Sequence, residues 1–296
     1  MFVITGITGN VGGEVARSLL QACDYTRGVV RGVARDIGKA QNWVEEGCEV
    51  VQADIRDATA LSVAFQDAEG VFILVPPNFD PEHNFPEARA IAAALKSALD
   101  TSHCNRVVYL STIGAKAKET NLLTQHSIIE EELGELTLPL TILRPAWFME
   151  NSSWDVVPAR DCGVIRSFLQ PLDKPVPMVA TADIGRVAAE LLRESWTGRR
   201  VVELEGPRRI TPNQIAATFG DLLGRAVRAE VVPRDTWESL FRSQGMKNPM
   251  PRIRMLDGFN EGWIEFESGE TGSRKGSVEL KRVLRGLIEA AGRSAA

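Results

Sequence analysis

Short apolar runs alternate with amphipathic patterns along the first 145 residues of the chain. Several runs are continuous stretches of Val, Ile and Leu, as expected for strands that are covered on both faces. These runs occupy residues 2–5, 28–34, 48–53, 70–75, 106–111 and 140–144. Between them, helical patterns lie at residues 11–22, 58–66 and 85–99. This alternation predicts an α/β fold with a doubly wound parallel sheet and right-handed crossovers.

The pattern changes after about residue 146. We expect residues 1–150 to form a nucleotide-binding domain, and residues 151–296 to form a smaller α/β substrate-binding region packed on it. The chain is expected to return to the first domain near residues 176–205. Residues 234–276, rich in Arg, Met, Phe and Trp, are expected to be irregular. The remaining elements of this half are predicted as helices at 182–195, 211–224 and 277–292 and strands at 201–206 and 225–233.

Glycines are concentrated between the first strand and the first helix, in "GITGNVGG" at residues 6–13. A strand before such a cluster and a helix after it are the context of a dinucleotide-binding loop. Gly6 can form the tight turn, Gly9 can let the backbone approach a pyrophosphate, and Gly12 can let helix and strand pack closely. Amides near Asn10 and Val11, with the helix dipole, then favour phosphate. A plain flexible turn is the alternative interpretation, and it is the weaker one. The pattern favours a Rossmann-type fold.

The second strand ends in "VARDIGKA", where many NAD-binding folds place an acidic residue for the ribose. Here Arg35 and Lys39 can hold a 2′-phosphate by charge-assisted hydrogen bonds, which favours NADP(H) over NAD(H). Asp36 lies between them and weakens this distinction, and a solvated charged turn remains open as an alternative. At the end of the third strand, Asp54 and Ile55 are candidates to flank an adenine.

Composition narrows the function classes. The net charge of −5, with 44% apolar and 25% charged residues, argues against a nucleic-acid partner. No apolar run is long enough for a membrane helix, and no secretion signal is visible. We therefore expect a cytoplasmic protein. The four cysteines and three histidines have no metal-ligand or redox spacing, so we expect no metal site and small buried thiols.

Together the motifs resemble the NmrA-like group of atypical short-chain dehydrogenases. This group includes bacterial NADPH quinone reductases, triphenylmethane-dye reductases and redox-sensing regulators. The glycine loop is common to many dehydrogenases, whereas "LRPAWFMEN" followed by "ADIG" is more specific. The resemblance extends to about residue 232, and residues 234–276 match nothing usable. It is carried by "GITGNVGG", "VARDIGKAQ", "GCEVVQADIRD", "LTILRPAWFMEN", "ATADIGRVAAELL" and "VELEGPRRITPNQIAATFGDLLGR".

The resemblance implies NADP(H) as the cofactor and an apolar small molecule as the substrate. The expected cofactor residues are Gly6, Thr8, Gly9, Asn10, Val11, Gly12, Arg35, Lys39, Asp54, Ile55, Val75, Pro76, Ser111, Thr112 and Pro145. It also places Trp147 and Phe148 beside the nicotinamide and the substrate. Outside the resemblance, Trp237, Phe241, Phe259 and Trp263 are candidates for an apolar lid over the nicotinamide. For all these aromatic residues, ordinary core packing is the open alternative.

The Tyr-x-x-x-Lys pair of carbonyl-reducing short-chain dehydrogenases is absent, because Val29 follows Tyr25 and Ile113 follows Tyr109 at that spacing. At the equivalent helix stands "HSIIE", which places His126 and Glu130 one turn apart. His126 is the candidate proton donor, with a structural histidine as the alternative. Ser111 and Thr112, at the tip of the fifth strand, either contact substrate and cofactor or cap the strand.

Two functions remain. The first is an NAD(P)H-dependent reductase of a flat, conjugated acceptor such as a quinone or dye, for which orientation and proximity supply most of the catalysis. The second is a non-catalytic NADP(H) sensor that binds a protein partner. The fold cannot separate them, and the sequence favours the reductase.

Overall fold

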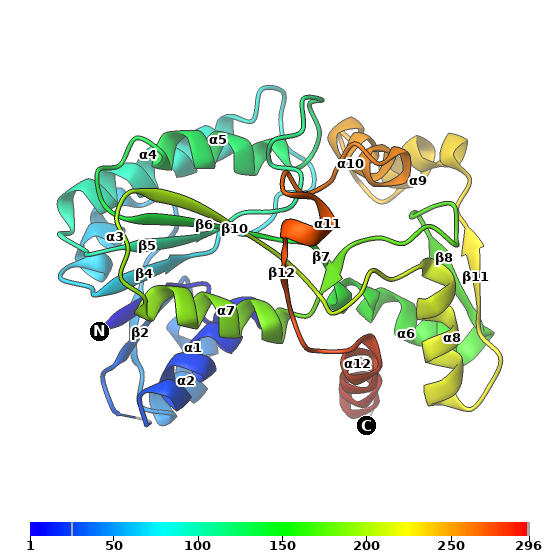
Figure 1. Ribbon diagram of the computed structural model, residues 1–296, viewed down its shortest axis with the longest axis horizontal. Coiled ribbons are helices and arrows are strands. Elements are labelled where there is room, and N and C mark those ends of the chain that lie inside the picture. Colours follow the sequence, from blue (N-terminus) through cyan, green and yellow to red (C-terminus); the bar gives the residue numbers. More distant parts are fainter. Residues whose placement is uncertain (25, 295–296) are drawn as a thin grey trace. The chain divides into compact units, whose positions relative to one another are not determined.

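The computed structural model describes residues 1–24 and 26–294, so that Tyr25 lies outside the described part. Within this part an eight-stranded sheet has the order β12-β10-β6-β5-β4-β1-β2-β3 (Figure 1). Its strands are β1 (Phe2–Thr5), β2 (Val30–Ala34), β3 (Glu49–Gln52), β4 (Gly70–Ile73), β5 (Val107–Leu110), β6 (Leu140–Pro145), β10 (Arg199–Glu205) and β12 (Arg274–Lys275). The predicted doubly wound sheet is confirmed.

The strand order reverses between β1 and β4. β1 pairs in parallel with β2 on one side and with β4 on the other, through Phe2 opposite both Val30 and Gly70. The order β3-β2-β1-β4-β5-β6 is that of dinucleotide-binding folds, in which ligands bind outside the carboxyl ends of the strands at the reversal. The end of β1, where the glycine loop begins, is therefore the expected binding edge.

The chain divides into two compact units, and it passes between them repeatedly. Unit 1 comprises Met1–Ala115, Leu123–Arg144 and Ile184–Val202. Unit 2 comprises Lys116–Leu122, Pro145–Asp183 and Glu203–Ala296. The chain thus leaves unit 1 after Arg144 and returns to it at Ile184, so that most of the helix α7 belongs to unit 1.

Helices cover both faces of the sheet in unit 1. One face carries α3, α4 and α5, and the other carries α1, α2 and α7 (Figure 1). The first face seals a core in which Leu61, Leu95, Tyr109 and Ile142 are fully buried. The helical elements are α1 (Asn10–Ala22), the 3-10 turn η1 (Ile37–Ala40), α2 (Gln41–Glu45), α3 (Ala58–Phe65), α4 (Pro86–Thr101), α5 (Thr124–Leu133) and α7 (Thr181–Arg193).

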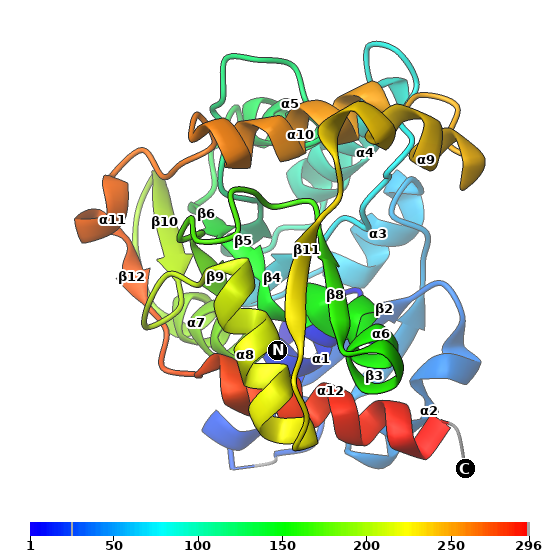
Figure 2. The same ribbon diagram turned by 90° about the vertical axis from the view of Figure 1, so that its right-hand side faces the viewer.

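Unit 2 is mainly helical, with two small parallel pairs, β11–β8 and β7–β9. Helix α8 packs on β11, α6 and α12 (Figure 2). Its start follows the sequence expectation, because Thr211 forms a capping box with Gln214 and Pro212 opens the first turn. The elements are β7 (Trp147–Phe148), η2 (Met149–Asp155), α6 (Val156–Cys162), β8 (Val164–Ser167), β9 (Met178–Val179), α8 (Pro212–Leu223), β11 (Arg228–Val231), η3 (Arg234–Thr236), α9 (Trp237–Ser243), α10 (Met250–Glu261), α11 (Gly269–Gly272) and α12 (Leu280–Ser294).

Two expectations are wrong. Residues 234–276 are not irregular, because they form α9, α10 and the short elements around them. The cysteines are not all buried thiols: Cys48 and Cys104 are buried, Cys23 is half-buried and Cys162 is exposed. Burial raises the pKa of Cys48 to about 11, so this thiol stays protonated and unreactive.

Candidate functional site

The glycine loop turns sharply between β1 and α1. Gly6 has φ of +67°, a left-handed conformation that glycine adopts without steric cost. A Cβ atom at Gly12 would lie 2.2 Å from the carbonyl oxygen of Gly6, so only glycine lets α1 pack this closely. A Cβ at Gly9 would meet only the same oxygen, at 3.4 Å. Gly12 therefore serves packing, while Gly9 leaves open space in front of the loop.

The first amides of α1 have no hydrogen-bond acceptor among residues 1–24 and 26–294. The first intrahelical bond runs from Gly13 N to Gly9 O at 2.9 Å, so the amides of Asn10, Val11 and Gly12 precede it. No side chain caps the helix at Gly9, and Thr8 is exposed beside it. Three amides, the positive end of the helix dipole and an open approach make this a fit for a phosphate group.

Two basic side chains stand at the end of β2. Arg35 and Lys39 are both exposed, and within residues 1–24 and 26–294 neither side chain forms a hydrogen bond or salt bridge. The carboxylate of Asp36 accepts a hydrogen bond from Gly38 N at 2.9 Å and so caps η1. Asp36 thus has a local structural partner, and the two cations remain available to an anionic ligand.

The end of β3 carries a second charged group. Asp54 accepts hydrogen bonds from Arg56 Nε at 3.0 Å and from the Arg56 amide at 2.9 Å. These bonds lower the pKa of Asp54, with a further contribution from the charge of Arg35. Ile55, the predicted adenine contact, packs partly buried against the core of unit 1. The ends of β2 and β3 are thus side by side, as a nucleotide base and ribose would require.

The end of β4 is tied to the end of β1. Thr5 Oγ1 donates to Leu74 O at 3.1 Å and accepts from Leu74 N at 2.8 Å. Val75 and Pro76 follow this junction. Gln125 Nε2 then donates to Asn78 O at 2.9 Å, which holds the loop after β4 against the first turn of α5. The predicted nicotinamide side and the turn carrying His126 are therefore adjacent within unit 1.

A buried ion pair lies behind this edge. Arg144, at the end of β6, donates from Nε and Nη2 to the Glu130 carboxylate at 2.9 and 2.7 Å. Ser111 Oγ donates to the same carboxylate at 2.6 Å. Arg144 is 2% exposed and Glu130 fully buried. The Ser111 hydroxyl is therefore bonded to Glu130 of α5, and its contact with substrate or cofactor stays a prediction. Thr112 is half-buried, and Pro145 is buried as the last residue of β6.

His126 pairs with a tyrosine, not with Glu130. Its Nδ1 lies 2.8 Å from the hydroxyl of Tyr109, which is fully buried on β5. Burial lowers the pKa of His126 to about 4, against a smaller opposite effect of the Glu130 charge. At pH 7 the imidazole is neutral, so no imidazolium is available to release a proton. Burial likewise raises the pKa of Tyr109 well above 10.

The predicted substrate aromatics of unit 2 have different surroundings. Trp147 meets Phe259 edge-on, with ring centroids 5.2 Å apart, and Phe148 is half-buried. Trp237 is fully buried, and its Nε1 donates to Val232 O at 2.8 Å. These contacts support the packing alternative for Trp237. Trp147 and Phe148 stay candidates for substrate contact.

Trp237 and Phe241 belong to one aromatic cluster. Both rings pack on Phe168, with centroids 5.6 and 5.3 Å away, and Phe241 is also fully buried. Trp263 follows the end of α10, and the guanidinium of Arg254 lies 5.7 Å from the centre of its ring. This cluster forms the core around α9, within residues 234–276, where the sequence predicts no regular structure.

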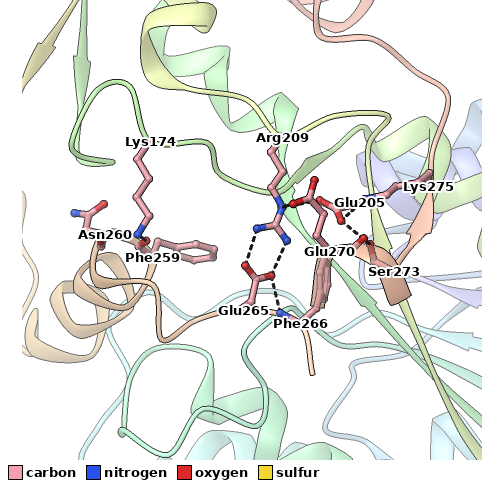
Figure 3. Close-up of polar contacts among 10 residues, drawn as sticks. All are labelled: Lys174, Glu205, Arg209, Phe259, Asn260, Glu265, Phe266, Glu270, Ser273 and Lys275. Carbon is pink, nitrogen blue, oxygen red and sulfur yellow. Dashed lines mark hydrogen bonds and ion pairs between the residues drawn. The ribbon is translucent and has the colours of Figure 1, made fainter. Parts of the chain in front are cut away.

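Arg209 fastens the segment after α10 to the end of β10 (Figure 3). Its guanidinium donates two bonds to Glu265, at 2.7 and 2.9 Å, and a third to Glu205 at 3.3 Å. Glu205 is fully buried and also accepts from Lys275 and Ser273. With every carboxylate paired, this network has the character of a structural clamp.

Asp155, at the start of α6, is a half-buried carboxyl group with no hydrogen bond or ion pair in the described part of the chain. Burial raises its pKa to about 7. The folded state therefore binds a proton that the unfolded state releases above pH 4, so this group lowers stability as pH rises from 4 to 7.

Asp155→Asn is expected to stabilise the protein at pH 8 by about 1–2 kcal/mol and to leave stability at pH 4.5 unchanged. The amide keeps the shape of the side chain and removes the charge. Urea unfolding at both pH values measures the difference. Asp161, an exposed neighbour paired with Arg160, gives the control variant Asp161→Asn, for which no such pH-dependent gain is expected.

Two negative findings apply to residues 1–24 and 26–294. These residues contain no group of three or more His, Cys, Asp or Glu side chains arranged to hold a metal ion. None of the helices they form has the length and apolar character needed to span a membrane.

Sequence reasoning missed Tyr109 and Arg144 as members of the site. Tyr109 is one of the two tyrosines, and a tyrosine at a strand end was the only available signal. Arg144 stands in the apolar run "LTILRP", where a charged residue in a strand buried on both faces indicates a buried partner.

The chain is similar in sequence to one protein family and to several reductases. The model described as the NmrA-like family matches residues 1–265. Quinone oxidoreductase 2 of Escherichia coli is 26% identical over 246 residues, which are 83% of this chain and 82% of that protein. The NAD(P)H azoreductase of Xenophilus azovorans is 24% identical, with coverage of 83% and 82%.

Solved structures share the fold. The triphenylmethane reductase of Citrobacter sp., complexed with NADP(H), superposes with a TM-score of 0.78 at 18% sequence identity. The superposition covers 98% of this chain and 99% of that one. The sheet and the helices around it are thus those of a known architecture.

Proposed function

The chain belongs to the NmrA-like family, and from this premise we propose that it is an NADPH-dependent reductase of a flat, conjugated acceptor such as a quinone or dye. The proposal is carried by the start of α1 at the strand-order reversal and by Arg35 and Lys39 at the end of the next strand. In the part of the chain that the structure describes, no side chain caps this helix start and neither cation has a partner. The names of its relatives, a quinone oxidoreductase and an azoreductase, agree with this substrate class.

The residues fit the cofactor. The amides of Asn10, Val11 and Gly12 would hold the pyrophosphate, and Arg35 and Lys39 would hold the 2′-phosphate of NADP(H). Ile55 would lie at the adenine, and Val75 and Pro76 at the nicotinamide. When bound, the cofactor supplies a hydride.

The residues around the nicotinamide side would orient the acceptor and would not donate a proton to it. The Tyr-x-x-x-Lys pair is absent, and the neutral His126 is adjacent to the loop after β4. A quinone takes up its proton from water after hydride transfer, so positioning is the main demand on the protein. Trp147 and Phe148 are the proposed apolar contacts. We include a cytoplasmic location in this proposal.

The deciding measurement is NADPH oxidation against a panel of quinones, azo dyes, triphenylmethane dyes and small carbonyls. The expected result is turnover with quinones or dyes and little with simple carbonyls. Calorimetry must show in parallel that NADPH binds. Tight NADPH binding without reduction of any acceptor would contradict the proposal and favour an NADP(H) sensor, whose positive test is cofactor-dependent capture of a protein partner.

Arg35→Ala is expected to weaken NADPH binding by about 1.5–3 kcal/mol and NADH binding far less, because only NADPH carries the 2′-phosphate. Titration calorimetry with both cofactors measures the two affinities. Arg27→Ala is the control, since this arginine precedes β2 at the opposite end of the strand. Equal losses for NADPH and NADH would reject the phosphate contact.

A further inference from the structure

Tyr109 has a single hydrogen-bonding partner. Its ring is fully buried among the apolar residues of unit 1. In the part of the chain that the structure describes, its hydroxyl contacts only His126 Nδ1, at 2.8 Å. A tyrosine hydroxyl can donate one hydrogen bond and accept others, and a neutral imidazole nitrogen does one or the other according to its tautomer.

Burial decides which group donates. If Nδ1 carried the proton, it would donate to the tyrosine oxygen, and the phenolic hydrogen would be left in the core without an acceptor. An unpaired buried donor is costly, whereas the reverse arrangement satisfies both groups. The Tyr109 hydroxyl therefore donates to Nδ1. A neutral imidazole that accepts at Nδ1 carries its single proton at Nε2.

The other ring nitrogen, Nε2, has no hydrogen-bond partner in the described part of the chain. Nε2 is not among the fully buried unpaired atoms there, so it keeps some exposed surface, while the His126 side chain as a whole is half-buried. His126 sits in the first turn of α5, next to Gln125, which holds the loop after β4. The Nε2–H group is thus available to donate to a ligand that reaches this turn of α5.

We propose that Tyr109 is a positioning residue that fixes His126 in the Nε2–H tautomer, and that this N–H donates a hydrogen bond to the oxygen of the bound acceptor. The second part rests on the proposed reductase function. The neutral state of His126 agrees with this assignment. Two titratable groups act on the ring, Tyr109 from β5 and Glu130 from α5, and the Glu130 charge is offset by Arg144.

The chemistry requires no proton from the histidine. A quinone gains a hydride, two electrons and one hydrogen nucleus, from NADPH, and a proton from water then completes the hydroquinone. Between these events negative charge accumulates on the quinone oxygen. A fixed N–H donor stabilises that charge as an oxyanion-hole group does, and it is regenerated unchanged.

The first test is the tautomer itself, which needs no turnover. Long-range ¹H–¹⁵N correlation spectra of the ¹⁵N-labelled protein distinguish protonated from unprotonated ring nitrogens. The signal of His126 is assigned with His126→Gln, because the chain has only three histidines. The expected pattern from pH 6 to 8 is a protonated Nε2 and an unprotonated Nδ1. In Tyr109→Phe both ¹⁵N shifts should move toward those of a mixed tautomer.

The second test is kinetic. Tyr109→Phe should lower kcat with a quinone by roughly three- to tenfold with little change in the KM for NADPH. His126→Ala should lower kcat at least as much, and adding Tyr109→Phe to His126→Ala should cost nothing further. Circular dichroism and thermal melting of each variant establish that it is folded.

The outcomes separate the two claims. A protonated Nδ1 in the wild type, or an unchanged tautomer in Tyr109→Phe, overturns the role of Tyr109. Wild-type turnover in His126→Ala overturns the donor role and leaves the reductase function standing. An acceptor panel that is not reduced at all overturns the reductase function, and the tautomer result is unaffected by it.

Discussion

Valine at position 9 is expected to abolish NADP(H) binding while the chain keeps its fold. Gly9 has φ of −91° and ψ of 171°, extended values that valine adopts readily. Its Cβ would meet only the Gly6 carbonyl oxygen at 3.4 Å, so the free protein has room for it. A branched side chain would nevertheless occupy the space in front of the α1 amides, where a pyrophosphate must approach.

Calorimetric titration of Gly9→Val with NADPH, beside circular dichroism, measures both parts of this prediction. Gly12→Ala is the contrasting variant. Its Cβ would lie 2.2 Å from the Gly6 carbonyl oxygen, so it should lower the stability of the fold itself. If folded Gly9→Val binds NADPH with unchanged affinity, the loop does not bind the pyrophosphate and is a plain turn.

Glu130→Gln is expected to lower the free energy of unfolding by about 3–5 kcal/mol. Removing this one charge leaves the Arg144 guanidinium buried without its counter-ion, at 2% exposure. The amide also replaces a carboxylate that accepts from Arg144 and Ser111 at once. Urea unfolding monitored by tryptophan fluorescence gives the difference.

The matched control is Glu131→Gln, on the exposed side of the same helix. This change should alter stability by no more than about 0.5 kcal/mol. Equal effects of the two variants would mean that the Arg144–Glu130 pair contributes little. Exchange of both partners for apolar residues of similar size is expected to recover much of the loss, because a buried pair and a packed apolar pair are often close in free energy.

The sheet of unit 1 could be predicted from the sequence because its strands are buried on both faces. Their apolar runs are therefore continuous, and β1 begins and ends as expected at Phe2 and Thr5. The strands β7 and β9 have two residues each and pair with each other across more than a helix of intervening chain. A strand of two residues is too short to show an alternation of apolar and polar positions, so the local sequence does not predict it.

The helices α9 and α10 were hidden for a different reason. Arginine side chains in and beside these helices cover aromatic rings: Arg252 of α10 lies 4.4 Å from the Phe241 ring, and Arg234 of η3 lies 4.9 Å from the Trp237 ring. A guanidinium that lies on a core aromatic counts as polar in the sequence although it packs as part of the core. The apolar period of α10 is thereby interrupted at Arg252, and the turn that leads into α9 begins with the polar Arg234.

The glycine loop was predictable because its residues are contiguous. The pairing of Tyr109 with His126, and of Ser111 with Glu130 and Arg144, was not. These five side chains come from β5, α5, β6 and the loop after β5. Their contacts depend on the register in which one helix lies across two strands, which spacing along the chain does not specify.

The division of the chain has a consequence for how the protein is synthesised. Every segment of unit 1 lies before Glu203, whereas unit 2 needs residues from Lys116 to the end. A growing polypeptide therefore contains the whole of unit 1 once Val202 has left the ribosome, and domains generally fold as they emerge. At that moment the segments Lys116–Leu122 and Pro145–Asp183 have been synthesised, but α8, α10 and α12, which belong to the same unit, have not. Unit 1, which carries the glycine loop, is thus the first unit that can fold during translation. A chain cut short after Val202 would contain all of unit 1 and only part of unit 2.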